Sequence, residues 1–91
     1  MAKLNPSEIK AALADTADWT KKGSAITRTF EFDDFAPAMK FVNSVAKLAE
    51  KANHHPDIDI RWNKVTLSLS THDQGGLTAK DFELAKKIDQ L

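Results

Sequence analysis

The spacing of apolar residues changes repeatedly along the chain, and each spacing predicts a different element. Apolar residues three and four positions apart indicate helices, whereas alternating ones indicate strands. Helical spacing covers residues 6–16, 35–53 and 79–91, and alternation covers 19–32 and 57–71. This order predicts an α+β fold of one domain over residues 1–91. We expect a four-stranded antiparallel sheet with three helices on one face, in the order α-β-β-α-β-β-α.

The residues before each helical stretch are those that commonly cap helices. Asn5 with Glu8 fits a capping box at the first helix. Thr78 with Asp81 fits the same motif at the last helix. Asp34 is expected to cap the central helix, because the proline three residues later then lies in the first turn, where its missing N–H breaks no bond. The central helix has the widest apolar stripe and should pack most deeply.

The second hairpin has the clearer alternation. A two-residue turn at Asn63 and Lys64 pairs apolar residues across the strands: Trp62 with Val65, Ile60 with Leu67 and Ile58 with Leu69. This register directs one apolar face of the hairpin to the core. Extended past Asp57 by parity, the same register places His55 opposite His72.

The first hairpin is less regular. Lys22 and Gly23 are expected to form its turn, which places Trp19 opposite Ile26. Arg28 interrupts the apolar face. The opposite face of the sheet carries small hydroxyl residues: Thr27, Thr29, Thr66, Ser68 and Ser70.

Composition excludes several functional classes. The 91 residues contain 13 basic and 13 acidic side chains and no cysteine. Without a basic run, a nucleic-acid partner is not indicated. Without cysteine, disulfides and thiolate metal sites are absent. No apolar run approaches the roughly 18 residues of a membrane span. A soluble cytoplasmic protein without a membrane partner is therefore expected.

Two adjacent histidines mark the corner after the central helix. Its helical pattern stops at Asn53, and Pro56 excludes His55 from helical backbone angles. His54 should therefore lie at the helix C-terminus and His55 in extended chain, with the two rings leaving in different directions. Imidazole is the side chain that ordinarily titrates near neutral pH, so these residues and His72 are candidate acid–base groups.

Each candidate also has a plain structural explanation. An imidazolium suits a helix C-terminus, which would explain His54. A capping box would explain Asp81, and core packing would explain Trp19. Three imidazoles could also bind zinc in a metal-dependent hydrolase. Adjacent histidines do not easily face one ion, however, so general acid–base catalysis is favoured. A non-catalytic binding module that stabilises a partner protein's oligomer is the main alternative.

Several segments together resemble one known family. They are EKANHHP at 50–56, WNKV at 62–65, LSTH at 69–72 and GLT at 76–78, followed by Asp81. In this combination the chain resembles, over nearly its whole length, the pterin-4a-carbinolamine dehydratases. The resemblance implies a small-molecule pterin substrate: a 4a-hydroxytetrahydropterin loses water to give quinonoid dihydropterin. It further implies no metal or organic cofactor, a tetramer built as a dimer of dimers, and a functional link to an aromatic amino acid hydroxylase.

The resemblance also implies roles for individual residues. His54, His55 and His72 match the family histidines that line the pterin pocket. We assign His54 and His72 to the proton transfers and His55 to holding the pterin, so that all three are candidate catalytic residues. Glu50 is expected to orient or charge His54.

Glu50, His55, Asp81 and Trp19 are the candidate substrate-binding residues, because Glu50 and Asp81 match the family acids and Trp19 also fits the family pattern. Two positions depart from that pattern. Asn53 stands where many relatives have Asp, and Lys80 stands where some have Arg. These differences put the charge of the pocket or its contacts with the pterin in question.

Overall fold

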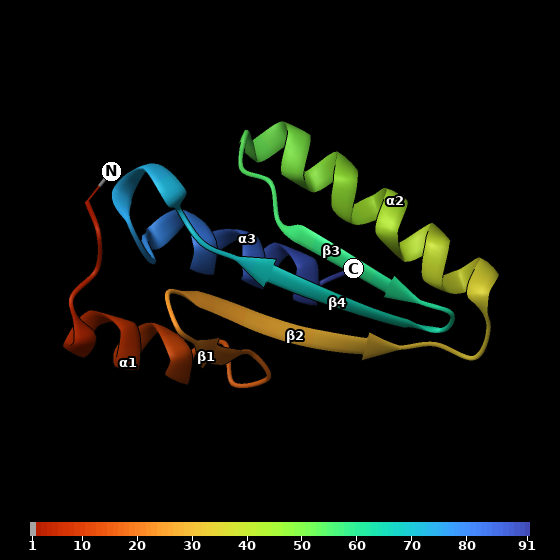
Figure 1. Cartoon of the computed structure of the whole chain (residues 1–91), viewed down its shortest axis with the longest axis horizontal. Helices are drawn as coiled ribbons and strands as arrows, with labels where there is room; N and C mark the ends of the chain where they lie inside the picture. The colour runs from red at the N-terminus through yellow and green to blue at the C-terminus, as the bar shows by residue number, and fades with distance from the viewer. Residues whose placement is uncertain (1) are drawn as a thin grey trace.

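The computed structural model describes residues 2–91 and has the predicted order of elements (Figure 1). These are α1 (Pro6–Ala14), β1 (Thr20–Lys22), β2 (Ala25–Glu31), α2 (Phe35–Ala52), β3 (Asp57–Arg61), β4 (Lys64–Leu69) and α3 (Ala79–Asp89), with a short 3-10 helix η1 (His72–Gln74) before α3. The predicted α+β fold is confirmed. Within residues 2–91, no helix has both the length and the hydropathy needed to cross a membrane.

The predicted helix starts are confirmed. The Asn5 side chain accepts from the Glu8 N–H at 2.8 Å, and Glu8 accepts in return from the Asn5 N–H. The Asp34 side chain caps α2 by accepting from the Phe35 N–H. Each cap satisfies a backbone donor that the first helical turn leaves free.

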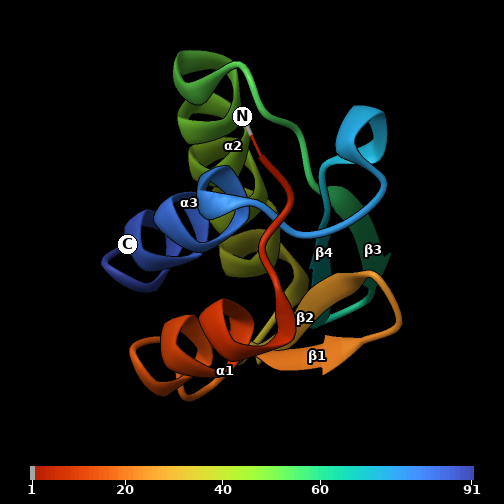
Figure 2. The same ribbon diagram turned by 90° about the vertical axis from the view of Figure 1, so that its left-hand side faces the viewer.

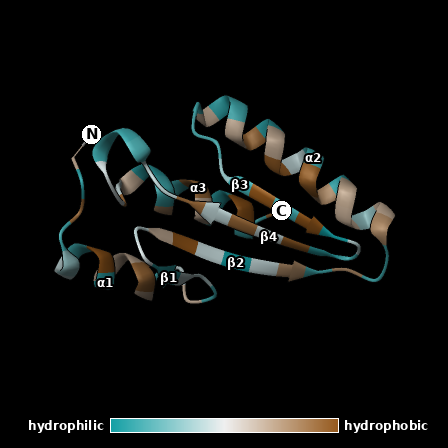
Figure 3. Ribbon diagram, in the orientation of Figure 1, coloured by the Kyte–Doolittle hydropathy of each residue, from teal (hydrophilic) through white to brown (hydrophobic). Residues whose placement is uncertain are grey.

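The four strands form one antiparallel sheet in the order β1-β2-β4-β3. Figure 2 shows α2 and α3 on one side of this sheet, with α1 on the same side next to the edge strand β1. The core between the layers takes apolar side chains from the central strands and from both large helices. Its fully buried members include Ile26, Val65, Leu67, Leu69, Val45, Leu84 and Ile88. Figure 3 shows hydrophobic stretches recurring along β2, β4 and the helices.

The β3–β4 register differs from the prediction by two residues. Ile60 pairs with Val65 and Ile58 with Leu67, so the turn is formed by Trp62 and Asn63. Asn63 sets this turn, because its side-chain amide donates to the Phe32 carbonyl at 2.8 Å and its own carbonyl accepts from the Phe32 N–H. The apolar residues keep their face, since side-chain direction repeats every two residues.

The predicted pairing of His55 with His72 is wrong. In the observed register, continuing past Asp57 brings His55 level with Ser70 rather than His72. The strand β4 has already ended at Leu69, and His72 begins η1.

The first hairpin is shifted by the same amount. Lys21, not Trp19, pairs with Ile26, and the turn falls at Gly23 and Ser24. Gly23 has a φ of 62°, which suits a glycine at the first position of a two-residue hairpin loop. Trp19 therefore lies before the hairpin, although it is still buried.

The sequence predicts that the apolar face of β3 points into the core, but in the structure this face is exposed. Ile58 is 39% exposed and Ile60 37%, whereas their partners on β4, Leu67 and Val65, are buried, and Trp62 in the turn after β3 is 64% exposed. The reason is strand order, because β3 is an outer strand and the helices cover the central strands β2 and β4.

Candidate functional site

The corner after α2 is fixed by Asn53. This residue has left-handed backbone angles (φ 51°, ψ 44°). Its N–H donates to the backbone carbonyl of Glu50, and the His54 N–H donates to the Ala49 carbonyl. Asn is one of the few residues besides Gly that adopts this conformation readily, and it ends helices for that reason. The turn confirms that His54 lies at the C-terminal end of α2 and sends its ring inward, whereas His55 is exposed.

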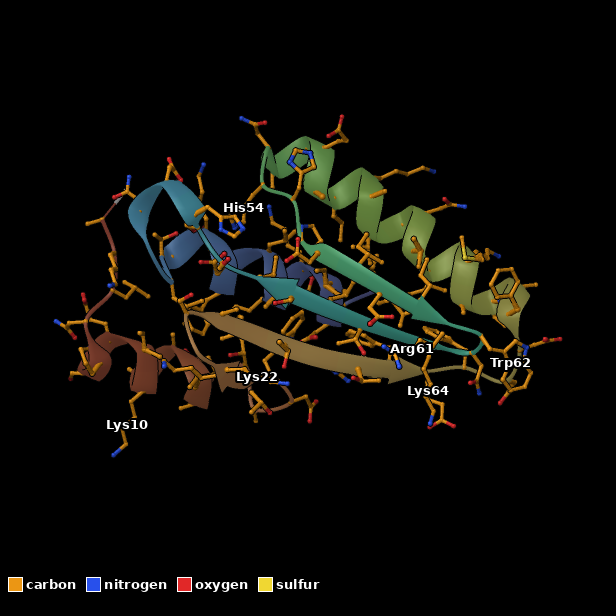
Figure 4. All side chains as sticks on the ribbon, viewed as in Figure 1. Lys10, Lys22, His54, Arg61, Trp62 and Lys64 are labelled. Carbon is orange, nitrogen blue, oxygen red and sulfur yellow. The ribbon has the colours of Figure 1, made fainter. Side chains whose placement is uncertain are left out.

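His54 contacts a carboxylate from the other end of the chain. Its Nε2 lies 2.5 Å from Oδ1 of Asp81, in the first turn of α3. The Asp81 side chain is 0% exposed and the His54 side chain 10%. Figure 4 shows the His54 ring between the end of α2 and the segment that leads into α3.

The second oxygen of Asp81 is held by two threonines. Oδ2 accepts from the Thr78 N–H at 2.9 Å and from the Thr71 hydroxyl at 3.0 Å. The two threonine hydroxyls also bond each other at 2.9 Å. Oδ2 therefore accepts two hydrogen bonds, and Oδ1 faces Nε2 of His54. An ionised carboxylate can only accept, so with Asp81 in that form Nε2 of His54 donates to Oδ1 and Nδ1 stays available for other chemistry.

Asp81 thus has two structural roles. One oxygen completes the capping box of α3 with Thr78, and the other contacts His54. Direct contact with a substrate, which we had predicted for Asp81, does not fit complete burial.

Glu50 contacts His55, not His54 as predicted. His55 Nε2 and Glu50 Oε2 are hydrogen-bonded to each other, and both side chains are exposed. The left-handed turn at Asn53 reverses the chain, so that His55 swings back toward the last turn of α2. Exposed pairs of this kind add little stability, so the contact serves mainly to orient the ring.

His72 lies at the same end of the sheet as the other two histidines. Asp57 at the start of β3 pairs with Ser68 near the end of β4, so the chain segments before β3 and after β4 emerge together. His72 is exposed and, within residues 2–91, makes no hydrogen bond to His54 or His55. The same described residues contain no group of three His, Cys, Asp or Glu side chains placed to hold a metal ion.

The structure separates Trp19 from this site. It is 3% exposed, and its indole N–H donates to both oxygens of Asp89 at 2.9 and 3.1 Å. Asp89 ends α3, about 12 Å along the helix axis from Asp81. The structure therefore gives Trp19 a packing role. Arg28 joins the same cluster, donating to Asp89 at 2.6 Å and covering Phe30, which explains a cation on the apolar face.

A hollow of about 190 Å³ adjoins His54 between the end of α2 and α3. Its lining includes Lys80, Glu83 and Lys87. Of these three charged residues, only Lys80 is a candidate from the sequence. Two larger hollows of about 290 Å³ each lie beside α1, and neither is lined by a histidine or a carboxylate. Volume alone therefore does not mark the functional site.

Thr71 and Thr78 were missed as site residues. A threonine on each side of the 72–77 loop, with an aspartate three residues after the second, was the available signal. That spacing predicted only the capping box, because the contact of Thr71 with Asp81 depends on how the loop folds over α3.

These features define a class: a small α+β protein whose one-sided sheet ends in a histidine–carboxylate pair beside two further histidines. Comparison with known families identifies the particular family within this class. The family described as pterin 4 alpha carbinolamine dehydratase matches residues 2–91, and the chain belongs to that family.

Individual relatives agree. A Roseiflexus castenholzii protein provisionally named a pterin-4-alpha-carbinolamine dehydratase is 59% identical over 90 residues, which cover 99% of this chain and 97% of the relative. A Nocardia farcinica protein with the same provisional name is 51% identical over 88 residues, which cover 97% of this chain and 93% of the relative.

Two solved structures are similar. The crystal structure of a transcriptional coactivator/pterin dehydratase from Brucella melitensis matches with a TM-score of 0.92 and 38% identity, covering 97% of this chain and 96% of that one. A pterin dehydratase-like protein identified as a RuBisCO assembly factor in the alpha-carboxysome matches with a TM-score of 0.65 and 22% identity, covering 79% of this chain and 83% of that one. This second likeness shows the fold alone.

Proposed function

We propose that the protein is a hydro-lyase that removes water from a 4a-hydroxytetrahydropterin to give quinonoid dihydropterin. The observation that carries the proposal is the His54–Asp81 pair, a nearly buried imidazole held by a buried carboxylate at the end of the sheet where His55 and His72 also lie. Family membership supports the choice of reaction.

The reaction needs one proton delivered and one removed. The bond between C4a and the hydroxyl oxygen breaks, the oxygen leaves as water after gaining a proton, and a ring nitrogen loses a proton. Imidazoles can perform both transfers near neutral pH. We assign the transfers to His54 and His72, one as acid and the other as base.

Asp81 defines which atom of His54 takes part. Because the Nε2 proton is bonded to the carboxylate, Nδ1 is the atom that exchanges a proton with the substrate. The buried negative charge also stabilises the imidazolium whenever His54 holds the second proton. The ring therefore keeps one orientation in both protonation states.

His55 and Glu50 are proposed to hold the pterin. The pair is exposed beside the corner, and Glu50 orients the His55 ring rather than that of His54. The proposed chemistry requires no metal ion and no organic cofactor, since imidazoles supply both proton transfers. A hydroxylase that oxidises aromatic amino acids with a tetrahydropterin would produce the substrate and is the proposed functional partner.

We also propose a homo-oligomer, a tetramer built as a dimer of dimers. All five residues of the outer strand β3 are exposed, including Ile58 and Ile60, and its outer edge is unpaired within residues 2–91. Such an edge favours pairing with another strand, which a second copy can supply. Light scattering should give more than the monomer mass at micromolar concentration, and Ile58→Lys should lower it. A monomer throughout would contradict this assembly.

The activity is tested by stopped-flow dehydration of synthetic 4a-hydroxytetrahydropterin. The wild-type protein should accelerate water loss at concentrations at which Trp19→Phe does the same and His54→Ala does not. A folded wild-type protein without acceleration would contradict the enzyme. The alternative, a binding module that stabilises a partner protein's oligomer, would then be favoured.

A further inference from the structure

Thr71 occupies the junction between the two proposed proton-transfer groups. It follows β4, is buried, and directly precedes His72. Its backbone is fixed on both sides, because its N–H donates to the Gly76 carbonyl at 3.1 Å and its carbonyl accepts from the Gly76 N–H at 3.3 Å. The start of η1, and with it the position of the His72 backbone, therefore depends on where Thr71 is held.

The direction of the hydrogen bonds around Thr71 can be deduced. A threonine hydroxyl has one proton, and that of Thr71 is donated to Asp81 Oδ2. In its contact with Thr78 the Thr71 oxygen must then accept, so the Thr78 hydroxyl donates. The resulting chain runs from Thr78 through Thr71 to Asp81, and the carboxylate accepts from His54 on its other side.

We infer that Thr71 is a positioning residue that couples His54 to His72. The inference rests on the proposed function for the roles of the two histidines. One hydroxyl fixes the carboxylate that orients the His54 ring, and the same residue anchors the segment that begins with His72. The spacing between the two proton-transfer groups therefore depends on a single residue, through its hydroxyl on the side of His54 and through its backbone on the side of His72.

The hydroxyl is required, beyond the packing of the side chain. Asp81 is completely buried, and a buried carboxylate is stable only while donors surround it. Thr71→Val keeps the size of the side chain but leaves Oδ2 with the Thr78 N–H alone and the Thr78 hydroxyl without its acceptor. The carboxylate then turns to recover a donor, and the His54 ring turns with it.

The test compares Thr71→Val, Thr71→Ser and a matched control, Thr29→Val. Thr29 also bonds another threonine, Thr66, at 2.8 Å, but on the open face of the sheet. Thr71→Val should lower kcat for dehydration by up to about 100-fold, the effect of a small misplacement of a reacting group, with little change in KM. Thr71→Ser should restore kcat, and Thr29→Val should leave it unchanged. If Thr71→Val does not fold, Thr71→Ala removes the same hydroxyl.

Two further measurements separate positioning from a general loss of packing. In an Asp81→Asn background, Thr71→Val should add little, because the carboxylate through which it acts is already gone. Nitrogen NMR should show the His54 ring of the wild type protonated at Nε2, and that single tautomer should be lost in Thr71→Val.

The outcomes are distinguishable. A wild-type protein without dehydratase activity overturns the proposed function, and the NMR measurement then decides the coupling by itself. Thr71→Val with wild-type kcat, or with an unchanged His54 tautomer, overturns the coupling. Equal losses in Thr71→Ser and Thr71→Val would also overturn it, since the serine keeps the hydroxyl.

Discussion

The two ends of α3 carry the same contact with opposite consequences. At each end an aspartate accepts a hydrogen bond from an aromatic ring N–H: Asp81 from His54 and Asp89 from Trp19. At Asp89 the donors are an indole, which does not ionise, and Arg28, which remains charged. Nothing there can change protonation near neutral pH, so the cluster only ties α3 to the first hairpin.

At Asp81 the situation differs. Apart from the histidine, its donors are a backbone N–H and a threonine hydroxyl, both neutral. Among residues 2–91, no salt bridge joins a lysine or arginine to this carboxylate. Of these three donors, the His54 ring is the one that can balance the charge by taking a proton. The comparison teaches that geometry alone does not identify an active site, because the ability of the donor to titrate decides.

The largest expected effect is at the histidines. His54→Ala and His72→Ala should each reduce dehydration by about 10²–10⁴-fold, the usual contribution of a general acid or base. The double variant should lose less than the product of the two, because groups that act together are not additive. Single-turnover kinetics with circular dichroism to confirm folding is the measurement. A folded double variant at the wild-type rate would refute the mechanism.

The next effect compares the two aspartates directly. Asp81→Asn should lower kcat by roughly 10- to 100-fold, less than loss of His54, because the ring remains but is no longer held. Asp89→Asn should leave kcat unchanged and reduce the free energy of unfolding by about 1 kcal/mol, a discounted value because its partner Arg28 is partly exposed. Urea unfolding and kinetics on both variants check this contrast. Equal loss of kcat in the two would mean that α3 acts only as scaffold.

A smaller effect is expected at the exposed pair. His55→Ala should raise KM for the pterin more than it lowers kcat, because His55 is proposed to hold the substrate. Glu50→Gln should raise KM less, since it removes only the partner that orients the ring. Steady-state kinetics separates the two parameters. If His55→Ala instead lowered kcat as much as His54→Ala, the assignment of roles would have to be exchanged.

The sequence predicted the elements well because their signals are local. Helix caps at Asn5 and Asp34 depend on a few neighbouring residues, and both are confirmed. Both hairpin registers were missed because they depend on contacts beyond the strands. Asn63 bonds to Phe32, and Trp62 takes a φ of 51° that bulky residues rarely adopt. The exposure of β3 was missed because periodicity does not give strand order.

The site was predicted in part for the same reason. The corner at His54 and His55 follows from a helix end and a proline, both readable locally. The partners of those rings do not. Glu50 was assigned to His54 because it lies one helical turn earlier, but the left-handed angles of Asn53 turn His55 toward it instead. The role of Thr71 depends on the hydrogen bond from its hydroxyl to Asp81, which the folding of the intervening loop determines.

The smallest expected effect is that of chelation, which should be none. Three histidines at one end of a sheet could be taken for a zinc site, but one ring nitrogen of His54 and one of His55 are already engaged. Nε2 of His54 is committed to Asp81 and Nε2 of His55 to Glu50, so a shared ion would need Nδ1 of both rings, which leave the corner in different directions. Dehydration should therefore continue at the same rate after exhaustive treatment with a chelator, with a zinc-dependent hydrolase as the positive control. If chelation abolished turnover and added zinc restored it, Asp81 would be orienting a metal ligand and not an acid–base group, and the contrast between the two ends of α3 would have to be explained in that way.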